Sequence, residues 1–438
     1  MAMAQSRGNW SGTLGFVLAA MGSAVGLGNI WRFSYITGEN GGAAFILVYV
    51  GCVAAVGIPL LIAELLIGRR TQRNVVGALS RLRPGSVWPV TGWLGVATGF
   101  FILSYYSVVG GWVLDYVVLS GLDSFSGQSA PAIGELFDSL RLSGPRQMFW
   151  HAVFMVLTIW FVSHGVARGI ELANRVMMPT LLLLLVFLLV YACTTGGAAQ
   201  GIAFLMTPDW SKIGPQTMLQ AIGQAFFSIG VGMGVMITYG SYLGRQTSLP
   251  RAALIVAGCD TGVAILAGFM IFPLVFTFAL QPDAGPALIF KTLPVAFGRL
   301  PFGNLLAVLF FLLLTFAALS SAISMLEVVV AYFVDERGWS RAAASWIIGG
   351  VIFALGIPAA LEGGVFDFIN ITTSDYMLPA GGLLIAIFAG WSLTHQERQA
   401  EIPASDLRPV LYLGWVFLLR FVAPIAVTII LLQSIGLF

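Results

Sequence analysis

The sequence predicts an all-α membrane protein with eleven transmembrane helices, and three observations support this fold class. Hydrophobic residues make up 58% of the 438 residues and charged residues only 9%, whereas soluble domains carry about 25% charged residues. Apolar stretches recur at about the 20-residue length that crosses a bilayer as a helix. Arginine is distributed unevenly between alternate connections. A soluble chain this poor in charge would expose large apolar patches, so composition excludes that class.

The apolar stretches also set the domain organisation. The predicted spans are 13–35, 42–67, 88–120, 148–166, 170–194, 217–243, 251–280, 302–334, 343–360, 364–392 and 410–436. Several exceed 25 residues, so we expect those helices to be tilted, broken or extended beyond the bilayer. No linker separates soluble domains, and the N-terminus lacks the features of a cleaved signal peptide. We therefore expect one transmembrane domain over residues 1–438.

The basic residues predict the orientation of the chain. Arginines concentrate at the N-terminus and in the connections that follow the even-numbered spans. Cytoplasmic loops of membrane proteins carry an excess of Lys and Arg. The predicted protein is therefore a multi-pass protein of the plasma (inner) membrane, with a cytoplasmic N-terminus and, because the span count is odd, an extracellular or periplasmic C-terminus.

The first and sixth spans contain glycine clusters, at 22–28 and 230–234. Unwound backbone is tolerated in a bilayer only where it lines a protein-enclosed cavity, and interrupted spans at matching places in two halves indicate a transporter binding site. This pattern predicts a five-plus-five inverted repeat with broken helices 1 and 6: helices 1–5 at 13–194, helices 6–10 at 217–392, then helix 11 at 410–436. The alternatives are close helix packing through small residues and, less well supported because no strand precedes the glycines, a dinucleotide-binding turn.

Oxygen-bearing side chains inside the spans suggest a site for a hard cation. Asn29, Ser228, Asp260, Ser320 and Ser321 lie in or beside the predicted helices, and sodium prefers carbonyl, hydroxyl, amide and carboxylate oxygens. The alternative is that the serines only bond the carbonyl one turn earlier. The cysteines and histidines are scattered, and no nucleophile–base set is evident, so we expect no catalytic residues, no enzyme activity, no organic cofactor and no nucleic-acid partner.

Several motifs carry a family resemblance that covers nearly the whole chain. The run Gly-Ser-Ala-Val-Gly-Leu-Gly-Asn-Ile-Trp-Arg-Phe is similar to the first-helix signature of the neurotransmitter:sodium symporters. The stretches that share the resemblance are 22–33, 39–45, 57–69, 224–228, 238–242 and 317–321. The chain resembles the prokaryotic amino-acid transporters of this family, which implies the fold of the bacterial leucine transporter. In that fold the interrupted helices face the binding site.

The resemblance implies two sodium ions and a set of residues for each. The first would use Ala24, Asn29, Ser228 and Asp260, with the substrate carboxylate. The second would use Gly22, Val25, Ala317, Ser320 and Ser321. The implied substrate site comprises Ala24, Gly26, Leu27, Gly28, Ile102, Tyr106, Phe227, Ser228, Gly230, Met233, Ser321 and Met325.

The resemblance also implies gates on either side of the substrate. Outside, Tyr106 and Phe227 would close over it, with Arg32 above them. Inside, Arg7 and Trp10 would tie to Asp335, near Ser241 and Tyr242. The chain departs from the family at the usual outer-gate aspartate, which aligns with Asn370, and Asp367 one turn earlier is the substitute we expect.

A second departure concerns charge beside the first sodium ion. Asp260 stands where the family usually has asparagine, and Ala264 stands where chloride-independent members often have glutamate. We therefore expect a sodium-coupled, chloride-independent symporter of amino acids, preferably hydrophobic L-amino acids, that works by alternating access. The alternatives are a sodium-coupled transporter of another small amine or zwitterion, and a non-pumping channel or receptor. The sequence makes no prediction of oligomeric state.

Overall fold

The structure, a computed structural model, describes residues 8–280 and 288–437, and within these ranges every regular element is helical. Arg7, expected in the inner gate, lies outside the described residues. The first five spans are α1 (Thr13–Ala24) with η1 (Gly28–Arg32) and α2 (Phe33–Glu39); α3 (Ala43–Cys52) with η2 (Val53–Gly57) and α4 (Ile58–Thr71); α6 (Pro89–Gly121); α8 (Gly144–Ser163); and η3 (Val166–Glu171) with α9 (Leu172–Ala192).

The other six spans lie in the apolar stretches that the sequence predicts. They are α11 (Pro215–Ile229) with α12 (Val235–Gly240); α13 (Leu249–Thr277); α15 (Gly303–Arg337); α16 (Arg341–Leu361); α17 (Gly363–Ile371) with η6 (Thr372–Met377), α18 (Leu378–Ile387) and η7 (Phe388–Ser392); and α20 (Pro409–Phe417) with η8 (Leu418–Val422) and α21 (Ala423–Ser434).

Length and apolarity support most of these spans directly. Among the described residues, eight helices are long and apolar enough to cross a membrane, and α1 with η1–α2, bent by 53°, forms a ninth span. The fourth span, α8, and the broken sixth span, α11–α12, complete the set by their places in the chain. Predicted and observed boundaries differ by at most four residues, for example at the fifth span, which begins at Val166 rather than at 170.

The predicted outer connections contain helices of their own. Residues 121–147 include α7 (Ala130–Leu142), 195–216 include α10 (Ala198–Met206) and a short turn η4 (Trp210–Lys212), and 288–297 form η5 (Leu288–Thr292) and α14 (Leu293–Phe297). At the other end, α5 (Val75–Leu82) and α19 (His395–Glu401) lie between spans. Proline occupies the first turn of α6, α8, α11, α13 and α20, where its missing N–H has no helical partner to lose.

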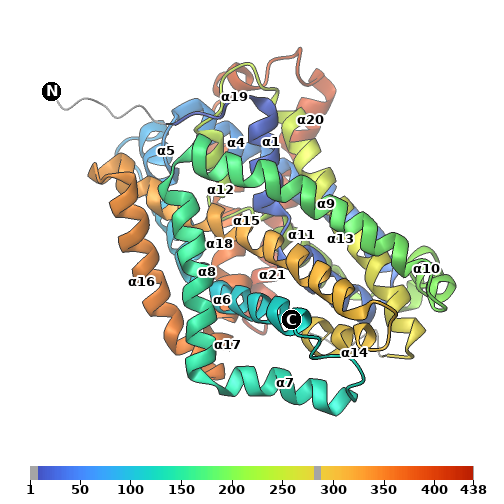
Figure 1. Cartoon of the computed structure of the whole chain (residues 1–438). Helices are drawn as coiled ribbons and strands as arrows, with labels where there is room; N and C mark the ends of the chain where they lie inside the picture. Colours follow the sequence, from blue (N-terminus) through green and yellow to red (C-terminus); the bar gives the residue numbers. More distant parts are fainter. Residues whose placement is uncertain (1–7, 281–287, 438) are drawn as a thin grey trace.

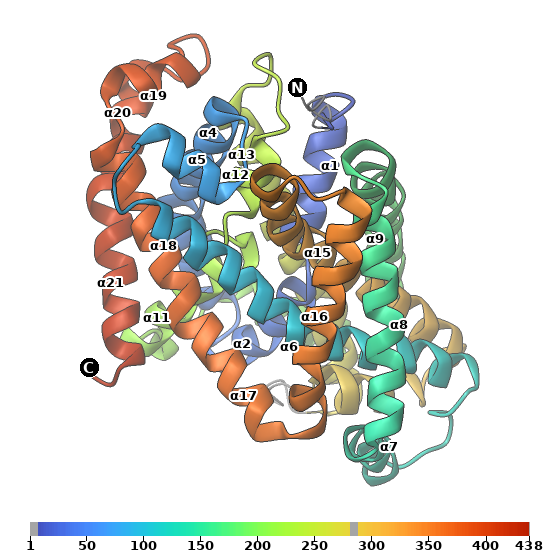
Figure 2. The same cartoon turned by 90° about the vertical axis from the view of Figure 1, so that its left-hand side faces the viewer.

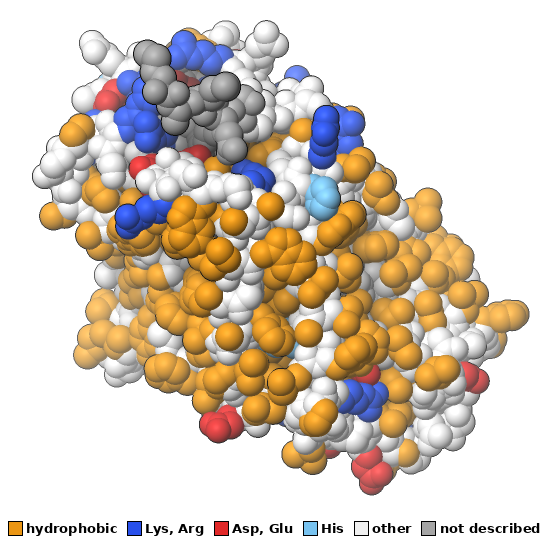
Figure 3. Space-filling view, turned by 60° about the vertical axis from the view of Figure 1, so that its left-hand side comes forward, with side chains coloured by type: hydrophobic (Ala, Val, Ile, Leu, Met, Phe, Trp, Pro, Cys, Tyr) orange, Lys and Arg blue, Asp and Glu red, His pale blue; other side chains and the backbone are white. Residues whose placement is uncertain are grey.

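The helices run between two ends of the molecule, which we call the α19 end and the α7 end (Figure 1). Chain direction alternates from span to span, and the start of α1 and the end of α21 lie at opposite ends (Figure 2). An apolar surface separates the two ends, and Lys and Arg gather on the visible face at the α19 end (Figure 3). The long helices α6 and α15 pack against each other in the middle. This arrangement is that of a multi-pass membrane protein.

Buried and half-buried ion pairs hold the α19 end together. The buried side chain of Arg69, at the end of α4, lies 2.8 Å from a carboxylate oxygen of Glu401 in α19. Arg83 donates to both carboxylate oxygens of Glu397, at 3.1 and 2.9 Å, and these hydrogen bonds lower the pKa of Glu397 to about 2. Arg398 donates to the carbonyl oxygens of Ala389, Gly390 and Leu393 at the end of the tenth span, which a cation stabilises.

Candidate ion- and substrate-binding site

The first span is broken in the middle of the molecule. α1 ends at Ala24, Val25 is extended with φ −72° and ψ 101°, and the helix resumes at Gly28. The side chain of Asn29 supports the break, because its Oδ1 accepts the N–H of Gly26 at 2.9 Å. The unwinding leaves the carbonyl oxygens around Ala24 and Val25 outside the regular helical ladder, so they can face a ligand.

The sixth span is broken opposite to it. α11 ends at Ile229, and Gly230, Gly232 and Gly234 take positive φ values of 67°, 97° and 75° before α12 begins at Val235. The buried carboxylate of Glu64, from α4, accepts the N–H of Gly232 at 2.7 Å and that of Met236 at 3.2 Å. Glu64 therefore satisfies backbone donors that the break exposes, which would otherwise be costly inside a bilayer.

The four residues expected around the first sodium ion meet between these breaks. Asn29 Nδ2 lies 3.0 Å from Ser228 Oγ and 2.6 Å from Asp260 Oδ1, and Ser228 Oγ donates to Asp260 Oδ2 at 2.8 Å. All three side chains are buried, and Ala24 lies at the end of α1 beside them. The cluster brings a carboxylate, a hydroxyl and an amide together: the NH₂ of Asn29 faces Ser228 and Asp260, while its Oδ1 accepts the N–H of Gly26. Carboxylate, hydroxyl and amide oxygens are the ligands that a hard cation prefers.

The residues expected around the second sodium ion join α1 to α15. Ser321 Oγ lies 3.4 Å from the carbonyl oxygen of Gly22 and 3.5 Å from that of Val25. Ser320 Oγ donates to the carbonyl oxygen of Ala317, one turn earlier, at 3.1 Å. All five are buried. Two hydroxyls of α15 and carbonyl oxygens from the break in α1 thus lie close together.

Ser320→Ala and Ser321→Ala are each expected to raise the half-saturating sodium concentration about tenfold. Each change removes one hydroxyl ligand and leaves packing nearly intact, and a tenfold loss corresponds to about 1.4 kcal/mol, the size of one hydrogen bond or ligand contact. Sodium titration of substrate binding measures it. The control is Thr315→Val, because Thr315 Oγ1 in the same helix bonds only the carbonyl of Phe311. Unchanged half-saturation in both serine variants would show that neither hydroxyl is a sodium ligand.

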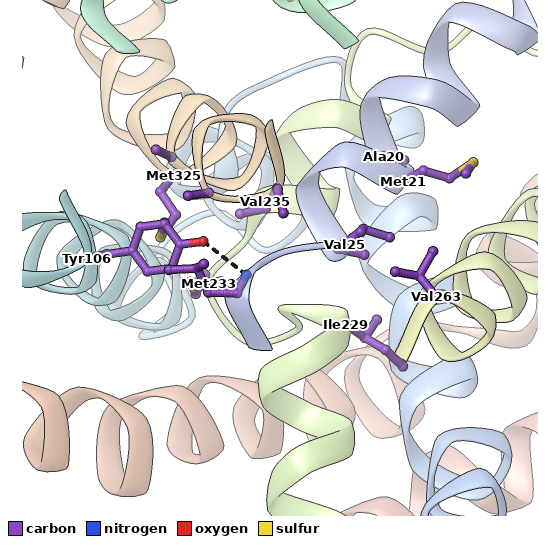
Figure 4. Packing of buried hydrophobic residues seen from close by; sticks show 14 of the residues in the cluster. Ala20, Met21, Val25, Tyr106, Ile229, Met233, Val235, Val263 and Met325 are labelled. Carbon is purple, nitrogen blue, oxygen red and sulfur yellow. Dashed lines mark hydrogen bonds between the residues drawn. The ribbon is translucent and has the colours of Figure 1, made fainter. Parts of the chain in front are cut away.

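A cavity of about 50 Å³ lies beside both clusters. Every residue of the expected substrate site lines it, and Tyr106, Met233 and Met325 approach the break in α1 from one side (Figure 4). Tyr106 Oη accepts the N–H of Leu27 at 3.4 Å. A Cβ on Gly26 would lie 2.7 Å from Ser321 Oγ and 3.3 Å from Tyr106 Oη. The cavity therefore combines backbone of the two breaks with apolar and methionine side chains.

A second cavity, of about 640 Å³, lies above the first on the side of α7. Tyr106 and Phe227, the side chains expected in the outer gate, line both cavities, as do Leu27 and Gly28. Arg32 stacks its guanidinium over the ring of Phe227, 4.9 Å from the centroid. Asp367 and Asn370 line the same cavity, but within the part of the chain that the structure describes no ion pair joins Arg32 to Asp367.

The described residues that the resemblance places in an inner gate lie on the α19 side of the breaks. The indole of Trp10 donates to the carbonyl oxygen of Tyr239, in α12, at 3.0 Å. The hydroxyl of Tyr242 donates to Glu327 at 2.6 Å. Asp335 accepts the backbone and side-chain N–H groups of Asn74, at 3.0 and 3.1 Å. The structure thus places Trp10 against α12 and Asp335 against the start of α5, and the expected tie through Arg7 falls outside the residues that it describes.

Comparison with known proteins identifies the family to which the chain belongs. The model of the "Sodium:neurotransmitter symporter family" matches residues 7–129 and 132–438. The chain belongs to this symporter family. The symporter is 41% identical to "Uncharacterized sodium-dependent transporter YhdH" from Bacillus subtilis (strain 168), over 98% of each chain. It is 35% identical to "Uncharacterized sodium-dependent transporter MJ1319" from Methanocaldococcus jannaschii, over 96% of this chain and 89% of that one.

A solved structure also resembles the symporter closely. The crystal structure of MhsT in complex with L-phenylalanine matches with a TM-score of 0.91 and 47% identity, over 98% of this chain and 100% of that one. The fold is therefore the one that the sequence predicts, that of a sodium symporter with eleven transmembrane helices and broken helices 1 and 6.

Sequence reasoning missed three residues that line the small cavity of the symporter. Ser23 Oγ donates to Ser324 Oγ at 2.9 Å, and Leu378 comes from the tenth span. Ser324 lies one turn after Ser321 on the same helix, and Ser23 lies within the first-helix motif, so spacing could have indicated both. Leu378 carries no such signal, because an apolar residue in an apolar span is typical of any lipid-facing or packing position.

Proposed function

We propose that this symporter couples sodium to the uptake of amino acids by alternating access. One observation carries the proposal: the polar cluster of Asn29, Ser228 and Asp260 borders the small cavity formed by the two broken helices, which Asn29 and Ser228 line. An ion bound in this cluster would meet the carboxylate of a zwitterionic substrate directly. Shared contacts of that kind link the affinities of ion and substrate reciprocally, typically by 1–3 kcal/mol.

The chemistry of the cavity supports an amino acid with an apolar side chain. Gly26 offers no carboxylate to a bare amine, so the substrate has to bring its own negative charge to the sodium ion. Ile102, Met233, Met325 and Leu378 surround the remaining space, and methionine adapts to irregular apolar shapes. MhsT, which is 47% identical, was crystallised in complex with L-phenylalanine. We propose hydrophobic L-amino acids as the preferred class.

We propose one sodium ion for each of the two polar clusters. The first would be held by Asn29, Ser228, Asp260 and the carbonyl of Ala24. The second would be held by Ser320, Ser321 and the carbonyls of Gly22, Val25 and Ala317. The first cluster contains a carboxylate and the second contains none, so Asp260 would supply the protein's fixed negative charge beside the ions. On this basis we propose that transport does not require chloride.

The distribution of charge supports an orientation in the plasma (inner) membrane. Lys and Arg gather at the α19 end (Figure 3), and the start of α1 lies at the same end (Figure 1). Under the positive-inside rule that end faces the cytoplasm, and the C-terminus lies outside. The 640 Å³ cavity would then open to the exterior, with Tyr106 and Phe227 between it and the substrate.

Uptake into proteoliposomes tests the proposal. Purified protein should concentrate labelled Leu, Met, Phe or Trp when an inward sodium gradient is imposed, with no accumulation when choline replaces sodium, and chloride replacement by gluconate should leave uptake unchanged. Unlabelled hydrophobic amino acids should compete better than glycine, acidic amino acids or dopamine-like amines. Equilibration without concentration would indicate a channel. Greater uptake of amines than of any amino acid would overturn the assignment of substrate class.

A further inference from the structure

Asn174 in α9 has a buried amide oxygen without a hydrogen-bond partner. The residue is fully buried, its Nδ2 donates to the carbonyl oxygen of Ile170 at 2.8 Å, and its Oδ1 bonds nothing in the described part of the chain. Leaving a buried polar atom unsatisfied costs about 1–3 kcal/mol. Such an atom in a folded protein therefore needs an explanation, and one common explanation is an ion that binds beside it.

The unpartnered oxygen lies against the second ion cluster. A Cβ placed on Gly22 would lie 1.8 Å from Asn174 Oδ1 and 3.1 Å from Ser320 Cβ. Gly22 and Ser320 are both residues of that cluster, and Ser321 Oγ lies 3.4 Å from the carbonyl oxygen of Gly22. The absence of a side chain at Gly22 thus leaves room for the amide of Asn174 to reach the cluster from a third helix.

The orientation of the amide follows from its other hydrogen bond. The carbonyl oxygen of Ile170 can only accept, so the amide group facing it at 2.8 Å is the NH₂. The oxygen consequently points toward Gly22. A hard cation takes amide oxygens readily as ligands. The second cluster is made of neutral hydroxyls and carbonyls, so one more oxygen dipole adds substantially to its attraction for a cation.

We propose that Asn174 supplies an oxygen ligand to the second sodium ion. The inference rests on the proposed function, because it takes the cluster of Gly22, Ser320 and Ser321 to hold sodium. It adds α9 to α1 and α15 as a helix that holds this ion. Sodium bound there would satisfy Asn174 Oδ1, and the ion would tie the fifth span to the broken first span.

Sodium-dependent thermal stability measures the affinity without any knowledge of the substrate. An ion that binds the folded state at a free concentration c stabilises it by RT ln(1 + c/Kd), so the rise in melting temperature as sodium replaces choline at constant ionic strength gives the Kd, which is the half-saturating sodium concentration. Asn174→Ala and Asn174→Leu should raise half-saturating sodium about tenfold, since each removes the oxygen. Asn174→Asp keeps an oxygen and adds a negative charge, and should lower half-saturating sodium at least about threefold.

Asn40→Ala is the matched control. Asn40 Nδ2 donates to the carbonyl oxygen of Ile36 at 2.8 Å, the same one-turn bond that Asn174 makes, at the far end of α2. The control should leave the sodium titration unchanged. Wild-type titration curves for both Asn174→Ala and Asn174→Leu would overturn the inference and leave Asn174 a helix-bonding residue. If these two do not fold, unaltered half-saturation in Asn174→Asp overturns it. Wild-type protein that sodium does not stabilise would instead contradict the proposed function.

Discussion

Asp260→Asn is expected to lower sodium-driven uptake in chloride-free medium about 100-fold and to make the remaining uptake depend on chloride. The carboxylate is fully buried and accepts hydrogen bonds from Asn29 at 2.6 Å, Ser228 at 2.8 Å and Tyr49 at 3.5 Å. Asparagine keeps the shape and removes the charge. Uncompensated charge in a low-dielectric interior is expensive, and breaking a buried pair costs about 3–5 kcal/mol, which is enough for a 100-fold loss.

The measurement compares uptake in chloride and gluconate media for wild type and variant. The donors expected to hold chloride in the variant are the hydroxyls of Tyr49 and Ser228, which contact the Asp260 carboxylate in the wild type. The control is Asp138→Asn, which removes an exposed carboxylate paired with Lys291 outside the spans. The assignment of Asp260 as the fixed counter-charge fails if wild-type uptake itself stops in gluconate, or if Asp260→Asn transports normally without chloride.

The fold was largely predictable because the bilayer restricts the choices. A span has to be a helix of about 20 apolar residues, so hydropathy and length locate it. The positions of the breaks could also be predicted, since Gly26 and Gly232 interrupt apolar runs where a continuous helix would otherwise form. The helices within the outer connections, such as α7 and α10, were not predicted, because short amphipathic segments on a surface carry weak signals.

The candidate site was predictable to the extent that its residues are polar. Asn29, Ser228 and Asp260 are costly in a membrane and so indicate function, and the structure brings them within hydrogen-bonding distance. The pairing of side chains across distant spans was not predictable. Arg32 stacks on Phe227, and this contact depends on how sharply the first and sixth spans bend at their breaks. The spacing of residues along the chain does not determine those bend angles.

The roles of two residues that support the site, Glu64 and Asn174, could not be predicted from the sequence. Glu64 is an intramembrane carboxylate, but only the structure shows that it accepts the N–H groups of Gly232 and Met236. Asn174 gave no signal, because asparagine in a helix usually bonds the preceding turn. Its unpartnered oxygen appears only when α9 is placed against Gly22. Such supporting roles arise from tertiary contacts that local sequence does not encode.

Gly232→Ala is expected to abolish substrate and sodium binding and to destabilise the fold by several kcal/mol. Gly232 has φ +97°, which L-residues rarely adopt, and such strain costs about 1–2 kcal/mol. A Cβ there would also lie 2.4 Å from the carbonyl oxygen of Leu378 and 2.8 Å from the N of Gly382. Both are backbone atoms of α18 and cannot move aside alone, and overpacking of this kind costs about 1–3 kcal/mol more.

The displacement would also reach the site itself. Gly232 donates its N–H to Glu64 at 2.7 Å, so moving this backbone breaks the contact that holds the sixth-span break open beside the cavity.

Two other glycine variants separate backbone strain from the steric clash with α18. Gly230→Ala shares the strain, with φ +67°, but among the described residues its Cβ meets only the flexible end of Met233, at 3.2 Å. A Cβ at Gly258 in α13 meets no described atom within 4 Å. Melting temperature and substrate affinity should fall most for Gly232→Ala, moderately for Gly230→Ala and not at all for Gly258→Ala, whose helix alanine favours. Wild-type binding by Gly232→Ala would show that α18 can move away from the sixth-span break. The close backbone packing on which the expected ranking of the three variants depends would then be wrong.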